Sequence, residues 1–514
     1  MMNNISYKIL VTIALVFLVF SGCQESKLDL KPLAETEQDI FDEEIDFDRA
    51  VLGVYAKITD IYWYNANQPK HRMWHAPGDD ITTAGITPFE TFAGLQPATP
   101  ELNMNGGDVG VTGYWRSVFN IISRANIVLQ KVEEEDGVYK TAGLKNSHHG
   151  EALFLRAWSY FQLWNFFGPA APLVTERIST SEGINPPSSE GTQLLDQAIE
   201  DLKMAADLLP NSWDANNRGR VVKSSANGLL GKVLVFRGTV NKSSADMTEA
   251  IAALNKITDK SLLVIYSDNF SVNQENNDES LFEFQAGSPS FDNIWLSNDF
   301  DRAVGAMTTF WGYFSAHWAI WDANNRLLAS QKFINKFNTD PRFLYSVDDG
   351  NTNYITKYVR EDQLAGAGVG SVNNPRILRY ADVVLLKAEA VLKSGGSKSE
   401  AIGLINQVRT RARTWGGGTE PADYNTGESD DATIMDWLMD ERMIELFGEE
   451  GHRWFDLRRW HMAGDINLST WTGSDTGFSS LRADFNFNVD KHLYFPAPEG
   501  EVNLNPKIVQ NSGY

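Results

Sequence analysis

Amphipathic helical segments that come in pairs constrain the fold of this chain more than any other feature of the sequence. Between Thr192 and Leu209, apolar side chains recur every three or four residues, and Pro210 follows the run. This spacing places them on one face of a helix. The apolar residues are Leu195, Ala198, Ile199, Leu202, Ala205, Ala206 and Leu209. Comparable patterns in 115–132, 151–167, 221–237, 248–257, 378–392 and 400–412 predict a mainly α fold.

Neighbouring helical patterns are separated by short breaks that contain glycine. Gly238 follows the segment 221–237, and Ser394-Gly395-Gly396-Ser397 separates 378–392 from 400–412. Helix pairs of this length favour tetratricopeptide-like helical hairpins that stack on one another. An irregular all-α domain is the alternative.

Long segments rich in Gly, Asn, Thr and Pro interrupt the helices, chiefly at 65–113 and 286–312 and more briefly at 366–370 and 414–428. Irregular segments of this length inside a compact domain are usually functional surfaces or flexible chain. We therefore expect the helical hairpins to scaffold long irregular loops. A few short strands, such as 281–285 and 354–359, are expected between them because their residues alternate.

The N-terminus carries the pattern of a secreted lipoprotein. The apolar run Ile9–Phe20 has 12 residues, fewer than the ~20 that span a bilayer. The following Ser21-Gly22-Cys23 is similar to the end of a bacterial lipobox. We expect residues 1–22 to be a signal peptide and Cys23 to carry acyl chains such as palmitate. An ordinary secreted protein with a free thiol is the alternative.

Charge and cysteine content restrict the partners and the kinds of site. The chain has 45 Lys and Arg against 67 Asp and Glu, a formal net charge of -22. Such an acidic surface repels phosphate backbones, so nucleic acid is not an expected partner. Cys23 is the only cysteine, which excludes an internal disulfide. No run after it is long and apolar enough to span a membrane, so we expect a lipid-anchored protein.

Five stretches in order along the chain resemble the SusD/RagB family of outer-membrane lipoproteins. They are Gly150–Thr175 (GEALFLRAWSYFQLWNFFGPAAPLVT), Thr339–Phe343 (TDPRF), Arg379–Leu392 with Ile405–Arg409, Glu441–Trp460 (ERMIELFGEEGHRWFDLRRW) and Leu493–Tyr514. The resemblance implies one compact α-helical fold with four tetratricopeptide-like units. Within it, residues 24–240 would form an N-terminal SusD-like region and residues 275–514 a C-terminal RagB/SusD region. It also implies an outer-membrane location, facing the outside, and nutrient capture for a SusC-like TonB-dependent transporter.

Two loop regions hold the residue types that bind oligosaccharides. Sugar rings pack their C–H faces on aromatic rings, and their hydroxyls need polar groups beside them. The resemblance places the ligand sites of the family in the same two regions. The candidate ligand-binding residues are Trp63, Tyr64, Trp74, Asp79 and Asp80 in the first region and Trp295, Arg302, Trp311, Tyr313, Trp318, Trp321 and Asn324 in the second. For each ring, loop packing or contact with the transporter is the alternative.

No group of residues forms a convincing catalytic site. Glu441 and Glu445 have the spacing of an acid–base pair on one helix face. Carboxylates and arginines are equally dense in this stretch, so we expect a charge-compensated structural network; its other members are Arg442, Glu449, Glu450, Arg453, Arg458 and Arg459. Asp79 and Asp80 are adjacent, and adjacent residues rarely oppose each other across a glycosidic bond. Hydrogen bonding or loop capping is the expected role of this aspartate pair.

Neither a metal nor another cofactor is expected. The histidines lack the spacing of a zinc site, and 268–279 lacks the central glycine of a calcium loop. The sequence therefore favours a non-enzymatic surface lipoprotein that binds an oligosaccharide or polysaccharide and delivers it to the transporter. A peptide-binding RagB-type uptake protein is the first alternative, and a surface glycosidase is the second.

Overall fold

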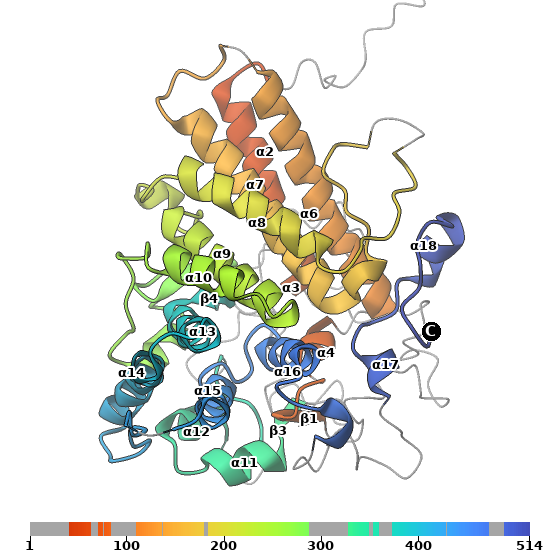
Figure 1. The fold of residues 1–514 in the computed structure, drawn as a ribbon. Coiled ribbons are helices and arrows are strands. Elements are labelled where there is room, and N and C mark those ends of the chain that lie inside the picture. The colour runs from red at the N-terminus through yellow and green to blue at the C-terminus, as the bar shows by residue number, and fades with distance from the viewer. Residues whose placement is uncertain are drawn as a thin grey trace, which may run out of the picture.

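Helices dominate the computed structural model of the protein (Figure 1). The structure describes residues 41–62, 70–75, 77–83, 109–135, 137–178, 183–286, 327–348, 353–358, 373–427, 429–471 and 488–514. The predicted mainly α fold is confirmed, with few and short strands between the helices.

The first group of helices packs in the order of the sequence. α2 (Glu44–Ala56) lies on α6 (Val109–Glu134) and α7 (Leu144–Phe167), and α7 packs on α8 (Gln193–Leu208). α9 (Lys223–Val240) packs on α8 and pairs with α10 (Ser244–Leu254). α8 confirms the helix predicted at Thr192–Leu209: its apolar stripe is buried, and it ends just before Pro210, which disfavours helical backbone in the residue before it.

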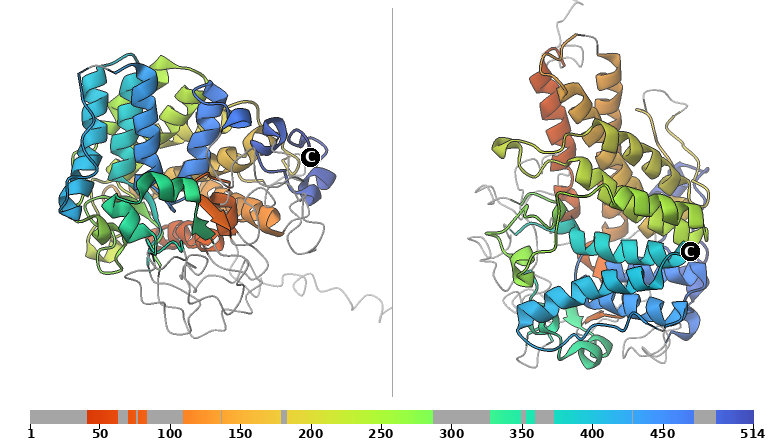
Figure 2. Two further views of the ribbon diagram at one scale, coloured as in Figure 1. Left: turned by 90° about the horizontal axis from the view of Figure 1, so that it is seen from below. Right: turned by 60° about the vertical axis from the view of Figure 1, so that its left-hand side comes forward.

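Four further helices form a second group: α13 (Tyr380–Lys393), α14 (Lys398–Gly416), α15 (Asp431–Glu445) and α16 (His452–Ala463). The side chains of Ser397 and Asp430 cap the N-termini of α14 and α15. α14 ends at Gly417, whose φ of 66° suits glycine at a helix end. α13 packs on α9 and α10 and so joins the two groups, and Figure 2 shows the second group in cyan and blue.

Two small antiparallel sheets complete the frame. β1 (Ile81–Thr83) pairs with β3 (Leu327–Ala329), and β2 (Ser280–Glu283) pairs with β4 (Arg376–Arg379). β2 confirms the strand predicted at 281–285. The short helices are α3 (Thr59–Tyr62), α4 (Lys70–His75), α11 (Gln331–Phe337), α12 (Pro341–Ser346), α17 (Val489–His492) and α18 (Glu499–Leu504).

The second predicted strand, 354–359, is shorter than expected. Tyr354 and Ile355 form isolated bridges with Leu328 and Val347, and the chain then turns at residues 357–358. The turn directs the ammonium group of Lys357 to the buried carboxylate of Glu449, at 2.5 Å. A buried ion pair therefore takes the place of continued strand pairing.

The main apolar core contains side chains from the N-terminal and the C-terminal halves of the sequence. Phe282 of β2 packs edge-on against Phe154 of α7, with ring centroids 5.0 Å apart, and Phe455 of α16 packs on Phe166 of α7 at 5.2 Å. The division into regions 24–240 and 275–514 stays a prediction. Within the described ranges, no helix combines the length and the apolar character needed to cross a membrane.

Candidate ligand-binding site

A strand pair holds two ends of the candidate ligand-binding segments together. β1 ends at Thr83, directly before residues 84–108, and β3 begins at Leu327, directly after residues 287–326. Thr83 is the pairing partner of Leu327 in this antiparallel sheet. Two segments that are distant in the sequence therefore meet the described fold at adjacent positions.

A pair of stacked rings joins the other ends. Tyr62 is the last residue of α3, and Phe284 follows β2 directly. Their rings are inclined by only 8°, their centroids lie 5.4 Å apart, and both side chains are buried. Such a pair stabilises the contact beyond the burial of its area. We call the Tyr62–Phe284 pair together with the β1–β3 pair the loop platform.

Trp74 lies in the core beside the loop platform. Its side chain is 2% exposed, and its ring packs against Tyr62 at 5.0 Å and edge-on against Tyr114 at 6.2 Å between centroids. Tyr114 is held in turn by a hydrogen bond from its hydroxyl to the side-chain oxygen of Gln162, at 2.8 Å. In this position the indole supports the ring pair, and its contact with a ligand stays a prediction.

Asp79 is fixed by three side chains. Its carboxylate accepts hydrogen bonds from Nε of Arg453 at 2.6 Å, from Nζ of Lys332 at 2.5 Å and from Nε1 of Trp471 at 2.9 Å. Burial opposes the charge of Asp79, but Arg453 and Lys332 outweigh it and hold its pKa far below the usual range. The expected hydrogen-bonding role is confirmed for Asp79, whose charge ties α11 and α16 to the start of β1.

The pKa of Asp80 is shifted in the opposite direction from that of Asp79. Burial, together with the charge of Asp79, raises its pKa to about 7. Its backbone carbonyl accepts a hydrogen bond from the backbone amide of Ser330, and the Ser330 hydroxyl donates to the carbonyl of Asp79, each at 2.8 Å. Residues 79–80 thus fasten the end of β3 to the start of β1, from beneath the loop platform.

The other predicted site residues lie outside the described residues. They are Trp63, Tyr64, Trp295, Arg302, Trp311, Tyr313, Trp318, Trp321 and Asn324, together with the predicted lipidation site Cys23. Their contacts with a ligand, and the lipidation of Cys23, stay predictions. The structure brings together the described ends of the segments that carry the ring residues.

The carboxylates with the spacing of a catalytic pair are engaged in a buried ion-pair network. Glu445 accepts hydrogen bonds from Nη1 of Arg379 at 2.6 Å and from Nη1 of Arg342 at 2.9 Å. Arg342 also binds Glu441, and Nε of Arg379 donates to Glu449 at 2.8 Å. Burial opposes ionisation of Glu445, but the neighbouring arginines lower its pKa well below the usual range. The predicted charge-compensated network is confirmed for Glu441, Arg442, Glu445, Glu449, Arg453 and Arg459. It is wrong for Glu450 and Arg458, which form no ion pair within the described residues; the Arg458 guanidinium packs on the rings of Trp164 and Tyr494 instead.

Glu450 follows the network residue Glu449 in the sequence and binds Tyr62 of the loop platform. It accepts a hydrogen bond from the Tyr62 hydroxyl, and burial raises its pKa to about 8. Burial outweighs the hydrogen bond from Tyr62 and the charge of Lys232, which both favour the ionised form, so a protonated Glu450 suits this position. In the described part of the chain, no set of three or more His, Cys, Asp and Glu side chains could hold a metal ion.

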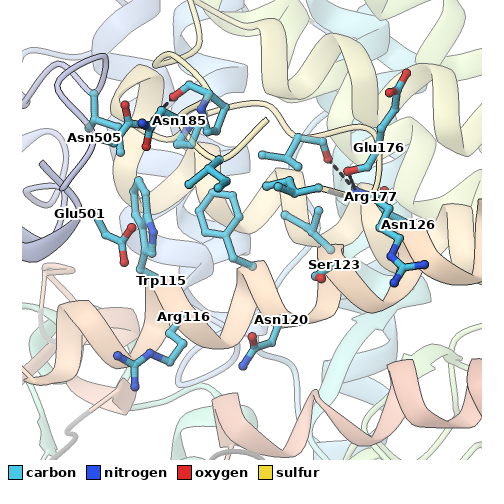
Figure 3. A pocket seen from close by; sticks show the side chains of 18 of the residues that line it. Trp115, Arg116, Asn120, Ser123, Asn126, Glu176, Arg177, Asn185, Glu501 and Asn505 are labelled. Atoms are coloured by element: carbon cyan, nitrogen blue, oxygen red, sulfur yellow. Dashed lines mark hydrogen bonds between the residues drawn. The ribbon is translucent and has the colours of Figure 1, made fainter. Parts of the chain in front are cut away.

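A separate groove of about 470 Å³ runs along α6 and is closed by residues 172–178, 184–186 and α18 (Figure 3). Trp115 rises from α6 into it, close to Glu501. Most of its lining is apolar, and Ile184 and Leu504 are 61% and 78% exposed at its edge. Its lining also holds polar side chains, among them Asn120, Ser123 and Asn126; we place the principal saccharide site at the loop platform instead, because the segments that carry the predicted ring residues meet there.

Two family models match the chain in succession. The model described as "Starch-binding associating with outer membrane" matches residues 28–235, and the model described as "SusD family" matches residues 348–514. SusD-like protein P2 of Formosa agariphila is 24% identical, with 99% of each chain covered. A SusD-like protein of Bacteroides ovatus is also 24% identical, over 96% of this chain and 93% of the relative.

Solved structures have the same fold. A SusD homolog from Bacteroides thetaiotaomicron superposes with a TM-score of 0.72 at 21% identity, over 93% of this chain and 99% of that chain. A laminarin-binding SusD-like protein superposes with a TM-score of 0.65 at 22% identity, over 92% and 100%. The family models match residues 28–235 and 348–514, and the two relatives align over 96–99% of the chain. The protein belongs to the SusD-like family.

Proposed function

We propose that the protein is a lipid-anchored carbohydrate-binding protein of the outer membrane, which captures an oligosaccharide or polysaccharide and delivers it to a SusC-like TonB-dependent transporter. Carbohydrate binding is supported by the description of one matching family model, which names starch, and by a similar solved structure that binds laminarin. The same model is described as associating with the outer membrane.

The observation that supports a single binding surface most strongly is the loop platform. The segment after Tyr62 carries Trp63 and Tyr64, and the segment after Phe284 carries Trp295, Trp311 and other aromatic residues. Both segments start at the stacked ring pair, and the second ends where β3 begins, at Leu327 of the β1–β3 pair. Aromatic rings and polar side chains from two distant parts of the sequence can therefore act on one ligand.

Binding by such a surface depends on several weak contacts. A ring contact contributes about 0.5–1.5 kcal/mol beyond area burial, so two or three rings hold a sugar chain without preventing its release. A protein anchored next to a transporter also raises the local concentration of its ligand there. Capture and delivery then need no chemical step, in agreement with carboxylates that are engaged in buried ion pairs.

Membrane attachment is proposed to occur through acyl chains on Cys23 after removal of residues 1–22. Two or more acyl chains hold a protein firmly on a bilayer, whereas one chain binds only marginally. The acyl chains would leave the folded part outside the bilayer. We propose that this part faces the outside of the cell, where polysaccharides are met first.

Affinity electrophoresis of a soluble chain, Gln24–Tyr514, which lacks the lipidated Cys23, tests the ligand class. The gels would contain laminarin, starch and a wider panel of polysaccharides, and bovine serum albumin would serve as the non-binding standard. We expect at least one polysaccharide to retard the protein. If none does, while a peptide mixture protects the protein against thermal unfolding, the carbohydrate proposal is wrong and a RagB-type peptide ligand replaces it.

A further inference from the structure

A polar pocket of about 340 Å³ lies beside the loop between α8 and α9, away from the groove along α6. Trp213 lines it together with Asn211, Ser212 and Lys260. The indole ring therefore has an amide, a hydroxyl and an ammonium group in the same pocket. Flat rings flanked by hydrogen-bonding groups suit a sugar, because its C–H face and its hydroxyls are satisfied at the same time. Its volume is at the lower end of the range for small-molecule sites.

The indole of Trp213 is held in one orientation. Its Nε1 donates a hydrogen bond to the backbone carbonyl of Val221 at 3.0 Å, and the guanidinium carbon of Arg220 lies 4.2 Å from its ring centroid. Arg220 is itself fixed by Glu151, at 2.8 and 2.7 Å, and by Asp48 at 2.6 Å. The guanidinium covers part of an already ordered ring, and a sugar would contact the part of the indole that stays exposed to the pocket.

The backbone beside Trp213 is equally constrained. Asp214 caps the short turn Ala215–Asn217 by accepting hydrogen bonds from the amides of Asn216 and Asn217. Gly219 has a φ of 94°, and a Cβ atom there would meet the side chain of Gln285 at 2.4 Å. Little conformational freedom is lost when a ligand binds to so ordered a loop.

Polar groups around the ring are free to bind a ligand. Within the described residues, the side chains of Asn211, Ser212 and Lys260 form no hydrogen bond or ion pair. By contrast, two charged groups that also line the pocket, Arg220 of the loop and Glu283 of β2, are engaged in ion pairs. The unengaged donors and acceptors therefore lie where a ligand on Trp213 could reach them.

The Trp213 pocket leads towards the loop platform. A second pocket of about 280 Å³ shares Arg218, Gly219, Arg220 and Glu283 with it, and continues along Ile58, Phe284 and Gln285. Phe284 belongs to the loop platform, where the aromatic segment 287–326 starts. The two pockets thus extend from Trp213 to Phe284, from which the aromatic segment follows in the sequence.

We propose that the Trp213 pocket is a second saccharide subsite, which binds the outer part of a glycan whose other part is held by the aromatic segments. This inference rests on the proposed carbohydrate-binding function and adds a dependence on chain length. A glycan that is long enough to reach both sites gains the second contact at a high effective concentration. A short oligosaccharide occupies only the principal site.

Trp213→Ala in the mature protein tests the subsite. Affinity for laminarin and starch would be measured by affinity electrophoresis, and affinity for their short oligosaccharides by calorimetry. We expect about 3- to 10-fold weaker binding of the responding polysaccharide and unchanged binding of its shortest bound oligosaccharide. Trp437→Ala is the matched control, because that ring is also partly buried, stacks on Tyr424 at 4.4 Å and lies on α15.

A triple variant guards against a folding effect. Asn211→Ala/Ser212→Ala/Lys260→Ala removes side chains that bind nothing within the described fold, so its thermal midpoint should equal that of the wild type, while polysaccharide binding weakens. Polysaccharide binding that both variants leave unchanged overturns the subsite but leaves the proposed function standing. A wild-type protein that binds no polysaccharide overturns both.

Discussion

The rings of Tyr62 and Phe284 are stacked with their centroids 5.4 Å apart, and the Tyr62 hydroxyl donates a hydrogen bond to Glu450. The Tyr62 side chain therefore joins the starts of two candidate ligand-binding segments to Glu450, which lies between the network residue Glu449 and the start of α16 in the sequence. The stability of the fold and the placement of the binding loops depend on the same ring pair.

Phe284→Leu tests this dependence. The change keeps an apolar side chain but removes the stacked ring, so we expect the free energy of unfolding to fall by about 1 kcal/mol and polysaccharide retardation to weaken. Phe161→Leu is the control, because that ring packs edge-on against Phe236 in the helical core, at 4.9 Å. It should lower stability by a similar amount and leave retardation unchanged. Equal retardation of both variants would contradict the role of the loop platform.

Loss of the Asp79 carboxylate should destabilise the fold strongly. Asp79→Ala leaves the buried Arg453 and the partly buried Lys332 without their shared carboxylate, so we expect a loss of about 3–5 kcal/mol in urea unfolding. Asp440→Ala, which breaks the more exposed pair with Lys336, should cost at most about 1 kcal/mol. Similar losses for the two variants would show that Asp79 does not anchor the site.

Glu450 should make stability depend on pH. Its folded pKa of about 8 exceeds its usual value of 4.5, so its contribution to stability is present at low pH and is lost as pH rises to 8. Asp80 acts in the same direction up to a pH of about 7. Burial lowers the pKa of His452 well below its usual 6.5. This shift makes stability rise with pH, but the rise ends at about pH 6.5, where the histidine of the unfolded chain has lost its proton. Between pH 6.5 and 8, Glu450 therefore dominates this set of groups.

We expect the free energy of unfolding of the wild type to fall by on the order of 2 kcal/mol between pH 6.5 and 8. Glu450→Gln keeps an acceptor for the Tyr62 hydroxyl but cannot ionise, so most of this fall should disappear. Urea unfolding at the two pH values checks the difference. An equal fall in both proteins would contradict the raised pKa of Glu450.

The groove along α6 should not contribute to glycan binding. Ile184→Asp and Leu504→Asp change highly exposed side chains at its edge, so stability should change by less than about 0.5 kcal/mol. Polysaccharide retardation should match that of the wild type. Loss of retardation in either variant would move the principal site from the loop platform to this groove.

Cys23→Ser should detach the protein from the membrane. Without the thiol no acyl chain can be added, so the proposed membrane anchor is lost. Fractionation of cells with detergent extraction would find the wild type in the outer membrane and the variant in a soluble fraction. A variant that stays in the membrane would contradict lipid anchoring at Cys23.

Local patterns in the sequence predict the helices well. The apolar spacing in Thr192–Leu209 depends only on neighbouring residues, and α8 follows it closely. The dense charges in 441–459 also predict a network, since so many carboxylates and arginines in one stretch must neutralise one another. The same sequence does not reveal that Arg342 and Arg379 supply much of that neutralisation, because both are brought in by tertiary contacts.

The contacts at the candidate site that the sequence does not predict are those between residues far apart in the chain. Asp79 appears in the sequence as half of an acidic pair, and its partner Arg453 is far away along the chain. The stacking of Phe284 on Tyr62 has no local pattern either. The sequence does not single out Trp213, because one tryptophan between Ser212 and Asp214 forms no periodic pattern. Its fixed orientation depends on contacts with Val221 and Arg220, which only the structure shows.

The most direct test of the account compares the wild type with Trp311→Ala/Trp318→Ala/Trp321→Ala in affinity electrophoresis, with Trp437→Ala as the control. We predict that one polysaccharide retards the wild type and the control, and that the triple variant loses this retardation while its thermal midpoint is unchanged. Retardation that persists would move the principal contacts to the segment from Trp63 to Trp74. A wild-type protein that no polysaccharide retards would contradict the central claim that this SusD-like protein binds carbohydrate.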